Sequence, residues 1–153
     1  MKTKRVRKIF IFFLLYAILI SACGMDESLL AMNREKWANA GIHSYEVRVQ
    51  HIQSIWHAQE YTITVENGTI SHSARCIPAP AEGKECEVTS YDPQDFTIEG
   101  LFRTAEWALN SIHSDHVKII YNTELGYPEH ISLDDPDILD EDNAWAVRDF
   151  STE

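Results

Sequence analysis

The spacing of hydrophobic residues changes along this chain, and it predicts two helices and six strands. Residues 26–41 are acid-rich and are predicted to form a helix, with Asp26 as its N-terminal cap and Gly41 just past its end. Residues 97–112 carry their apolar side chains on one helical stripe. Apolar and polar residues alternate, as in half-buried strands, over residues 45–50, 61–65, 69–75, 117–121, 131–133 and 144–150. The Asn67-Gly68 pair predicts a tight hairpin between two of these strands.

The predicted order is a helix and three strands, followed by a second helix and three more strands. This order favours an α+β domain in which two helices pack on a mainly antiparallel sheet. All the strand connections can be hairpins or short crossings, so a doubly wound parallel sheet is not expected. KWANAGIHSYEVRV and EWALNSIHSDHVKI also echo each other, which indicates an αβββ-αβββ pseudo-repeat.

The first 22 residues follow another pattern. MKTKRVRK holds five bases and no acid, Ile9 to Ile20 are apolar or aromatic, and the small residues Ser21 and Ala22 precede Cys23. This layout is typical of a secretory signal. The apolar run is shorter than the roughly 20 residues that a transmembrane helix needs. An uncleaved membrane anchor is the alternative interpretation.

Ile20-Ser21-Ala22-Cys23 resembles the lipobox of bacterial lipoproteins, in which a diacylglycerol is attached to the cysteine and the chain is cut just before it. The resemblance implies a signal peptide over residues 1–22 and a lipidated Cys23 with a short tether over residues 23–28. The domain proper then covers residues 29–153. Several acyl chains give stable membrane anchoring. Gly24, not Asp, follows the cysteine, which favours the outer membrane, facing the periplasm, if the cell has two membranes.

Removal of the signal makes the chain strongly acidic. The whole chain has 13 Lys and Arg against 24 Asp and Glu, and five of the bases leave with residues 1–22. The remaining eight bases and 24 acids give a net charge of −16 with His neutral. Such a charge argues against a nucleic-acid partner and against a chain that lies flat on anionic lipid. It favours solubility, cations or a basic partner.

Two further cysteines, Cys76 and Cys86, stand in RCIPAPAEGKEC. An isolated pair in an oxidising envelope predicts a disulfide. Closing so small a loop would stabilise the domain by roughly 2–3 kcal/mol. A metal site would need more soft ligands than this pair offers.

The segment LDDPDILDEDN is a candidate cation or ligand site. Its acids are Asp134, Asp135, Asp137, Asp140, Glu141 and Asp142. Ca²⁺ binds about six to eight oxygens, and such a loop could supply several, but the spacing departs from the standard calcium loop. Tyr121 and Tyr127 could form an aromatic rim beside it. The alternatives are a solvated acidic loop and a hairpin in which Tyr127 packs.

Three runs, TIEGLF, VKIIYNTELGYPEHISLD and DEDNAWAVRDF, resemble a bacterial family known as domain of unknown function 6174. The resemblance extends from about Trp37 to Phe150. Many members of that family are lipoproteins, in agreement with the Cys23 motif. The resemblance implies a fold, and it carries no activity, cofactor or site residue to this chain.

Signatures of common catalytic sites are missing from the sequence. There is no Gly-x-Ser-x-Gly, no Ser-x-x-Lys and no phosphate-binding glycine loop. His113 and His116, like His51 and His57, lack the further ligands of a zinc site. We therefore expect no cofactor and a lipid-anchored, non-enzymatic binding or assembly module with an envelope protein as partner. Three tryptophans would be the first interface anchors to test: Trp37, Trp56 and Trp107.

Overall fold

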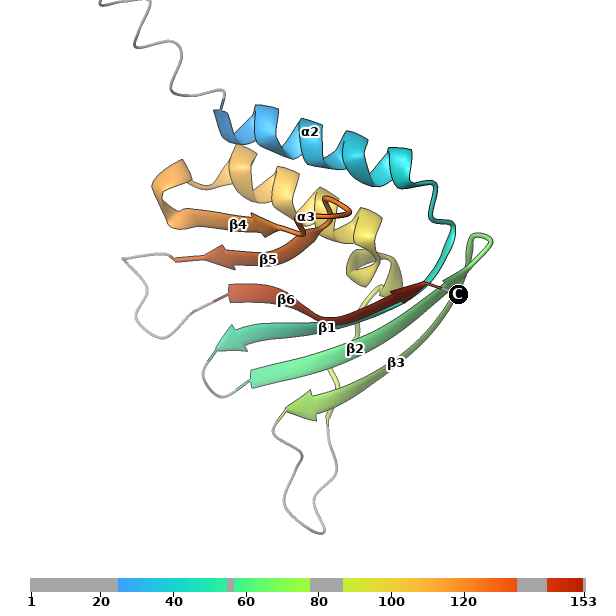
Figure 1. Ribbon diagram of the computed structural model, residues 1–153. Helices are drawn as coiled ribbons and strands as arrows, with labels where there is room; N and C mark the ends of the chain where they lie inside the picture. The colour runs from blue at the N-terminus through green and yellow to red at the C-terminus, as the bar shows by residue number, and fades with distance from the viewer. Residues whose placement is uncertain (1–24, 55–56, 78–86, 135–142, 153) are drawn as a thin grey trace, which may run out of the picture.

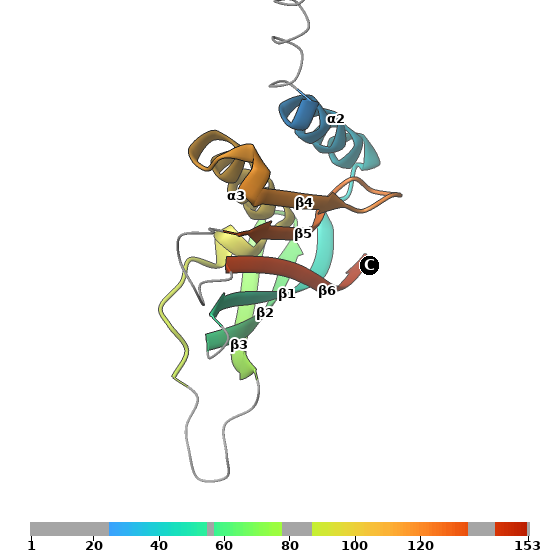
Figure 2. The same cartoon turned by 90° about the vertical axis from the view of Figure 1, so that its left-hand side faces the viewer.

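A computed structural model describes residues 25–54, 57–77, 87–134 and 143–152, and they form one sheet with both helices on the same side of it (Figures 1 and 2). The elements in chain order are α2 (Met25–Ala40), β1 (Ser44–Ser54), β2 (His57–Glu66), β3 (Thr69–Ile77), the 3₁₀ turn η1 (Pro93–Phe96), α3 (Ile98–Ser111), the 3₁₀ turn η2 (Ser114–His116), β4 (Val117–Tyr121), β5 (Pro128–Leu133) and β6 (Asn143–Thr152). The α+β prediction is confirmed. No helix among the described residues is long and apolar enough to cross a membrane.

The sheet has the strand order β3-β2-β1-β6-β5-β4, and every neighbouring pair is antiparallel. Each half of the chain forms a three-stranded meander, and the first and last strands join the two halves at the centre. Asn67 and Gly68 have φ values of 49° and 84°. Positive φ at both central residues is the geometry of a type I′ turn, so the predicted hairpin between β2 and β3 is confirmed.

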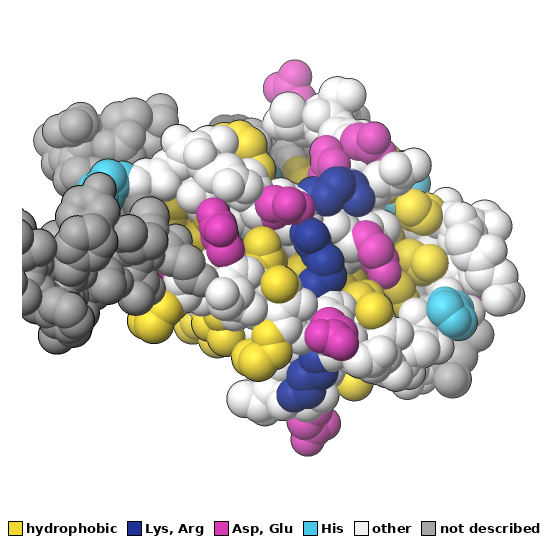
Figure 3. Space-filling model, turned by 90° about the horizontal axis from the view of Figure 1, so that it is seen from above, with side chains coloured by type: hydrophobic (Ala, Val, Ile, Leu, Met, Phe, Trp, Pro, Cys, Tyr) yellow, Lys and Arg dark blue, Asp and Glu magenta, His cyan; other side chains and the backbone are white. Residues whose placement is uncertain are grey.

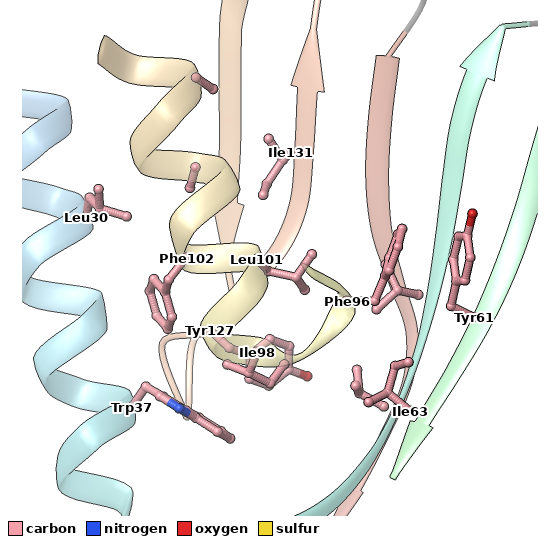
Figure 4. Close-up of a cluster of buried hydrophobic side chains, with 14 of the residues drawn as sticks. Leu30, Trp37, Tyr61, Ile63, Phe96, Ile98, Leu101, Phe102, Tyr127 and Ile131 are labelled. Atoms are coloured by element: carbon pink, nitrogen blue, oxygen red, sulfur yellow. The ribbon is translucent and has the colours of Figure 1, made fainter. Parts of the chain in front are cut away.

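The core lies between α3 and the sheet (Figure 4). Ile98 and Leu101 point from α3 toward the strands, while Phe102 points toward α2. All three side chains are no more than 2% exposed. They belong to the stripe that the sequence pattern predicts for residues 97–112. Helix α2 adds Leu30 and Trp37 to the same core, and the Trp37 ring lies 5.6 Å from that of Tyr45 in β1 and 5.8 Å from that of Phe150 in β6, between centroids.

The two helices are not equivalent, although the halves of the chain share their element order. Trp37 in α2 is 6% exposed, whereas Trp107, its counterpart in the sequence echo, is 51% exposed. The reason is the layering: α3 packs directly on the sheet, and α2 packs over α3 (Figure 2). Trp107 follows the buried Ala105 by two residues, about 200° around the helix, so it faces away from the core.

Candidate functional site

A groove crosses the helix-bearing face of the domain. The C-terminal half of α2, the turn into β1, the β2–β3 hairpin and the first turns of α3 form it. It consists of two adjoining cavities of about 570 and 530 Å³, and we call it the helix groove. Both cavities are lined by Ile42, His43, Glu99 and Arg103. Figure 3 views this face, where hydrophobic side chains show between a line of Lys and Arg side chains and several Asp and Glu side chains.

The carboxylate of Glu99 lies at the junction of the two cavities and is held from both sides. Trp37 Nε1 donates a hydrogen bond to its Oε1 at 3.1 Å, and the Tyr45 hydroxyl donates to its Oε2 at 2.8 Å. The same hydroxyl accepts a hydrogen bond from Ile98 N at 3.1 Å. Burial, with a further contribution from the charge of Glu99, raises the pKa of Tyr45. The phenol therefore stays a neutral donor at physiological pH.

Local contacts hold the N-terminus of α3 in place, and from there the Glu99 side chain extends into the groove. Thr97 caps the helix, and its Oγ1 accepts a hydrogen bond from Gly100 N at 3.0 Å. Gly100 leaves no room for a side chain, because a Cβ there would lie 2.2 Å from the carbonyl oxygen of Gln94. The η1 turn thus packs tightly under the helix N-terminus. In the run TIEGLF, Thr97 therefore caps the helix, Gly100 makes room for the η1 turn, and Ile98, Leu101 and Phe102 belong to the core.

Charged side chains of both signs line the rim. Arg34 contacts Glu106 at 2.9 Å and lies 5.5 Å from the centre of the Phe102 ring. Arg103 is 3.5 Å from Asp95. All four charged side chains are more than 40% exposed, and such ion pairs contribute about 1 kcal/mol or less. Each guanidinium also donates a hydrogen bond to a backbone carbonyl, Arg34 to Phe102 O at 3.3 Å and Arg103 to Gln94 O at 3.0 Å, so a ligand would compete with both contacts.

Residues 29–152 match the family of unknown function DUF6174. The chain belongs to this family. The DUF6174 match begins within α2 and ends in β6, so it takes in most of α2, all of α3, the whole sheet and the helix groove. No curated protein and no solved structure gives a significant match to the chain.

Within the DUF6174 domain, Tyr127 lies in the core. It is 5% exposed, and its ring is 6.1 Å from that of Trp37 and 4.9 Å from that of Phe150, between centroids. Burial raises its pKa, and also raises the pKa of the half-buried Tyr121 to about 12. The structure therefore agrees with the packing interpretation of the Gly-Tyr-Pro hairpin. A ligand at the surface would not meet the Tyr127 ring.

Most of the other predicted site residues lie outside the described residues. This holds for Cys23, Trp56, Cys86, Asp135, Asp137, Asp140, Glu141 and Asp142. Asp134 is exposed, and its N–H donates to His116 O at 2.8 Å. Cys76 lies half-buried near the end of β3. The lipidation, the disulfide and the acidic-loop site stay predictions. Among the described residues, no three His, Cys, Asp or Glu side chains converge as metal ligands would.

Of the residues that line the helix groove, sequence reasoning selected Trp37 as a candidate interface anchor and did not select the others. Glu99 and Arg103 are separated from Trp37 by more than 60 positions, and no short motif joins them. The available signal was indirect. Trp37 and the TIEGLF run both belong to the family resemblance, and the structure brings them together through the hydrogen bond between Trp37 and Glu99.

Proposed function

We propose that this DUF6174 protein is a lipid-anchored envelope protein that acts by binding a segment of another protein in the helix groove. The observation that carries the proposal is the groove itself. Each of its two cavities falls within the roughly 300–1,000 Å³ of known ligand sites. Because the cavities share four residues, an extended ligand could occupy both.

The lining favours a polypeptide over a small polyanion. Ile42, Val65 and Ile70 are partly exposed and offer apolar surface, while Trp37 and Phe102 are almost fully buried. The rim presents guanidinium and carboxylate groups together, so it could contact side chains of either sign. A polyanion would meet the field of a chain with a net charge of −16 after signal removal. A mixed or basic protein segment would not be repelled in this way.

The predicted lipid anchor would also limit how far the helix groove lies from the membrane. Helix α2 begins at Met25, two residues after Cys23, and two residues span at most about 7 Å. The α2 residues of the groove lie within a helix of 16 residues, about 24 Å long. A lipid on Cys23 would therefore hold the groove within about 30 Å of the membrane. This geometry suits a partner in or beside the same membrane.

Crosslinking in cells tests the proposal. The tagged full chain is crosslinked and its adducts are identified by mass spectrometry, with Arg103→Glu as the groove variant. Arg148→Glu, on an exposed side chain of β6 outside the groove, is the matched control. Circular dichroism verifies that both variants fold.

We expect one recurrent stoichiometric partner whose yield drops at least tenfold with Arg103→Glu and is unchanged with Arg148→Glu. A chain without a partner, or a partner indifferent to the groove, would contradict the binding role. Cys23→Ser tests the anchor separately. A Cys23→Ser chain that still partitions with membranes would show that the lipobox interpretation is wrong.

A further inference from the structure

Three apolar side chains of α2 form a stripe that is largely exposed, with Leu29 also lining a small cavity beside Val117, Ile119 and Tyr121 of β4. Met25, Leu29 and Met32 are 72%, 41% and 59% exposed. They are spaced four and three residues apart, so they lie in one line along the helix. The residues of α2 that face the core, Leu30 and Trp37 among them, lie on a different side. Figure 3 shows exposed hydrophobic side chains on this face of the molecule.

We propose that the Met25–Leu29–Met32 stripe rests on the lipid bilayer in which Cys23 is anchored. The inference builds on the proposed lipid anchor and assigns a surface of the folded domain to the membrane. Single exposed apolar residues are ordinary on protein surfaces. A line of three at the end of the helix nearest the lipid is what requires an explanation.

Chain length places the stripe at the bilayer surface. Met25 lies within about 7 Å of a lipidated Cys23. Leu29 and Met32 follow about 6 and 10 Å further along the helix axis. With acyl chains holding Cys23 at the interface, the first two turns of α2 stay within about 17 Å of it. Methionine and leucine side chains there gain by entering the boundary between headgroups and acyl chains, as in amphipathic helices that lie on membranes.

The charged residues of α2 lie beside the stripe, opposite it or beyond its end. Glu27 lies on the opposite side of the helix, whereas Asp26 and Glu35 lie about 60° from Leu29 and Met32 and flank the stripe. Lys36 continues the line of the stripe, four residues after Met32, and its Nζ donates to Thr123 O. Its stem lies against Gly126, so Lys36 packs on the turn between β4 and β5 and the apolar stripe ends at Met32. The three stripe residues are themselves uncharged, and the exposed carboxylates of Asp26 and Glu35 lie at the edges of the stripe, where they can stay in water.

The placement also orients the helix groove. Arg34 lines the groove and follows Met32 by two residues, which is about 200° around the helix. With the stripe against the bilayer, the groove opens on the far side of α2 and stays accessible to a partner in the aqueous space. The anchor and the stripe together would then fix the direction in which the domain presents its groove.

The methionines of this chain provide the test. The sequence has three, Met1, Met25 and Met32, and Met1 leaves with the signal. Cells that express the full chain are grown with a photoreactive diazirine analogue of methionine, so that every photoadduct of the processed protein starts from the stripe. We expect most adducts to be phospholipid. The N-terminal peptide is analysed in the same sample for acylation of Cys23.

The matched control moves the reactive group to another surface. The variant Met25→Leu/Met32→Leu/Ser73→Met keeps the stripe apolar and places the only methionine of the processed chain on an exposed position of β3. This strand lies at the end of the molecule opposite α2 (Figure 1). We expect its lipid adducts to fall at least tenfold below those of the unchanged chain.

The possible outcomes test the membrane contact of the stripe and the lipid anchor separately. An acylated Cys23 with stripe adducts mainly to a protein, or to a second copy of this chain, overturns the membrane placement and leaves the anchor standing. Equal lipid labelling from residue 73 overturns the placement as well. An unacylated Cys23 overturns both.

Discussion

Replacing Tyr45 with phenylalanine removes one oxygen atom, and the structure gives that atom two partners. The hydroxyl donates to Glu99 at 2.8 Å and accepts from the buried N–H of Ile98 at 3.1 Å. Ile98 is the first residue of α3, and the N–H groups of a first helical turn have no partner within the helix. Tyr45 thus joins β1 to the start of the central helix. We expect Tyr45→Phe to destabilise the domain without changing its fold.

The magnitude follows from the two bonds. A hydrogen bond to a charged group contributes about 1.5–3 kcal/mol, and a buried N–H left without a partner costs about 1–3 kcal/mol. Glu99 is exposed to the groove, so water can replace the lost donor, and the first contribution falls at the low end. The expected loss in the free energy of unfolding is about 2–4 kcal/mol. At a urea dependence of about 2 kcal/mol per molar, the middle of the usual range, the unfolding midpoint should fall by roughly 1–2 M.

Tyr121→Phe is the matched control. The Tyr121 hydroxyl is also buried, but no hydrogen-bond partner lies near it among the described residues. Deleting a buried hydroxyl without a partner is close to neutral or stabilising. Urea unfolding at pH 7, followed by far-UV circular dichroism on the processed chain with Cys23→Ser, measures both variants. The reasoning is refuted if Tyr45→Phe lies within 0.5 kcal/mol of the parent, or if Tyr121→Phe loses as much.

Three further outcomes are expected. Gly126→Ala should lower the free energy of unfolding by about 2–4 kcal/mol, because φ is +82° and the new Cβ would lie 2.6 Å from the carbonyl oxygen of Asn33 in α2. Gly68→Ala, at φ +84° with open space around it, should lower it by only about 1 kcal/mol. The urea midpoints of the two variants test this difference. Burial raises the pKa of Tyr121 to about 12, so the native state keeps a proton that the unfolded state releases above about pH 10. This contribution to the free energy of unfolding should therefore be complete below pH 10 and be lost as the pH rises toward 12, so the fall should be gentler in Tyr121→Phe. Urea unfolding at a series of pH values from 9 to 12 measures it, and a free energy that does not change with pH would contradict the prediction. If the acidic loop of residues 134–142 binds Ca²⁺ tightly, millimolar Ca²⁺ must raise the melting temperature and excess chelator must reverse the shift; a melting curve unmoved by Ca²⁺ counts against that site.

Much of the secondary structure could be predicted from the sequence because it depends on neighbours along the chain. Alternating residues give the strands one buried side, and the positive φ of Asn67 and Gly68 is a local preference of those residue types. The stripe over residues 97–112 became the buried side of α3 for the same reason. The basic and apolar N-terminal run and Cys23 likewise predict the anchor from local pattern alone.

The helix groove and the roles of single aromatic residues depended on packing between distant segments. Periodicity tells which side of an element is buried, and it does not tell which element covers that side. Trp37 and Trp107 occupy matching places in the sequence echo, yet only the first is covered, because α2 packs over α3 while the far side of α3 meets solvent. Trp37 and Glu99, 62 residues apart, meet only when both helices lie on one side of the sheet. The sequence alone therefore determined the elements and their order, and the tertiary structure decided which side chains form the groove and which form the core.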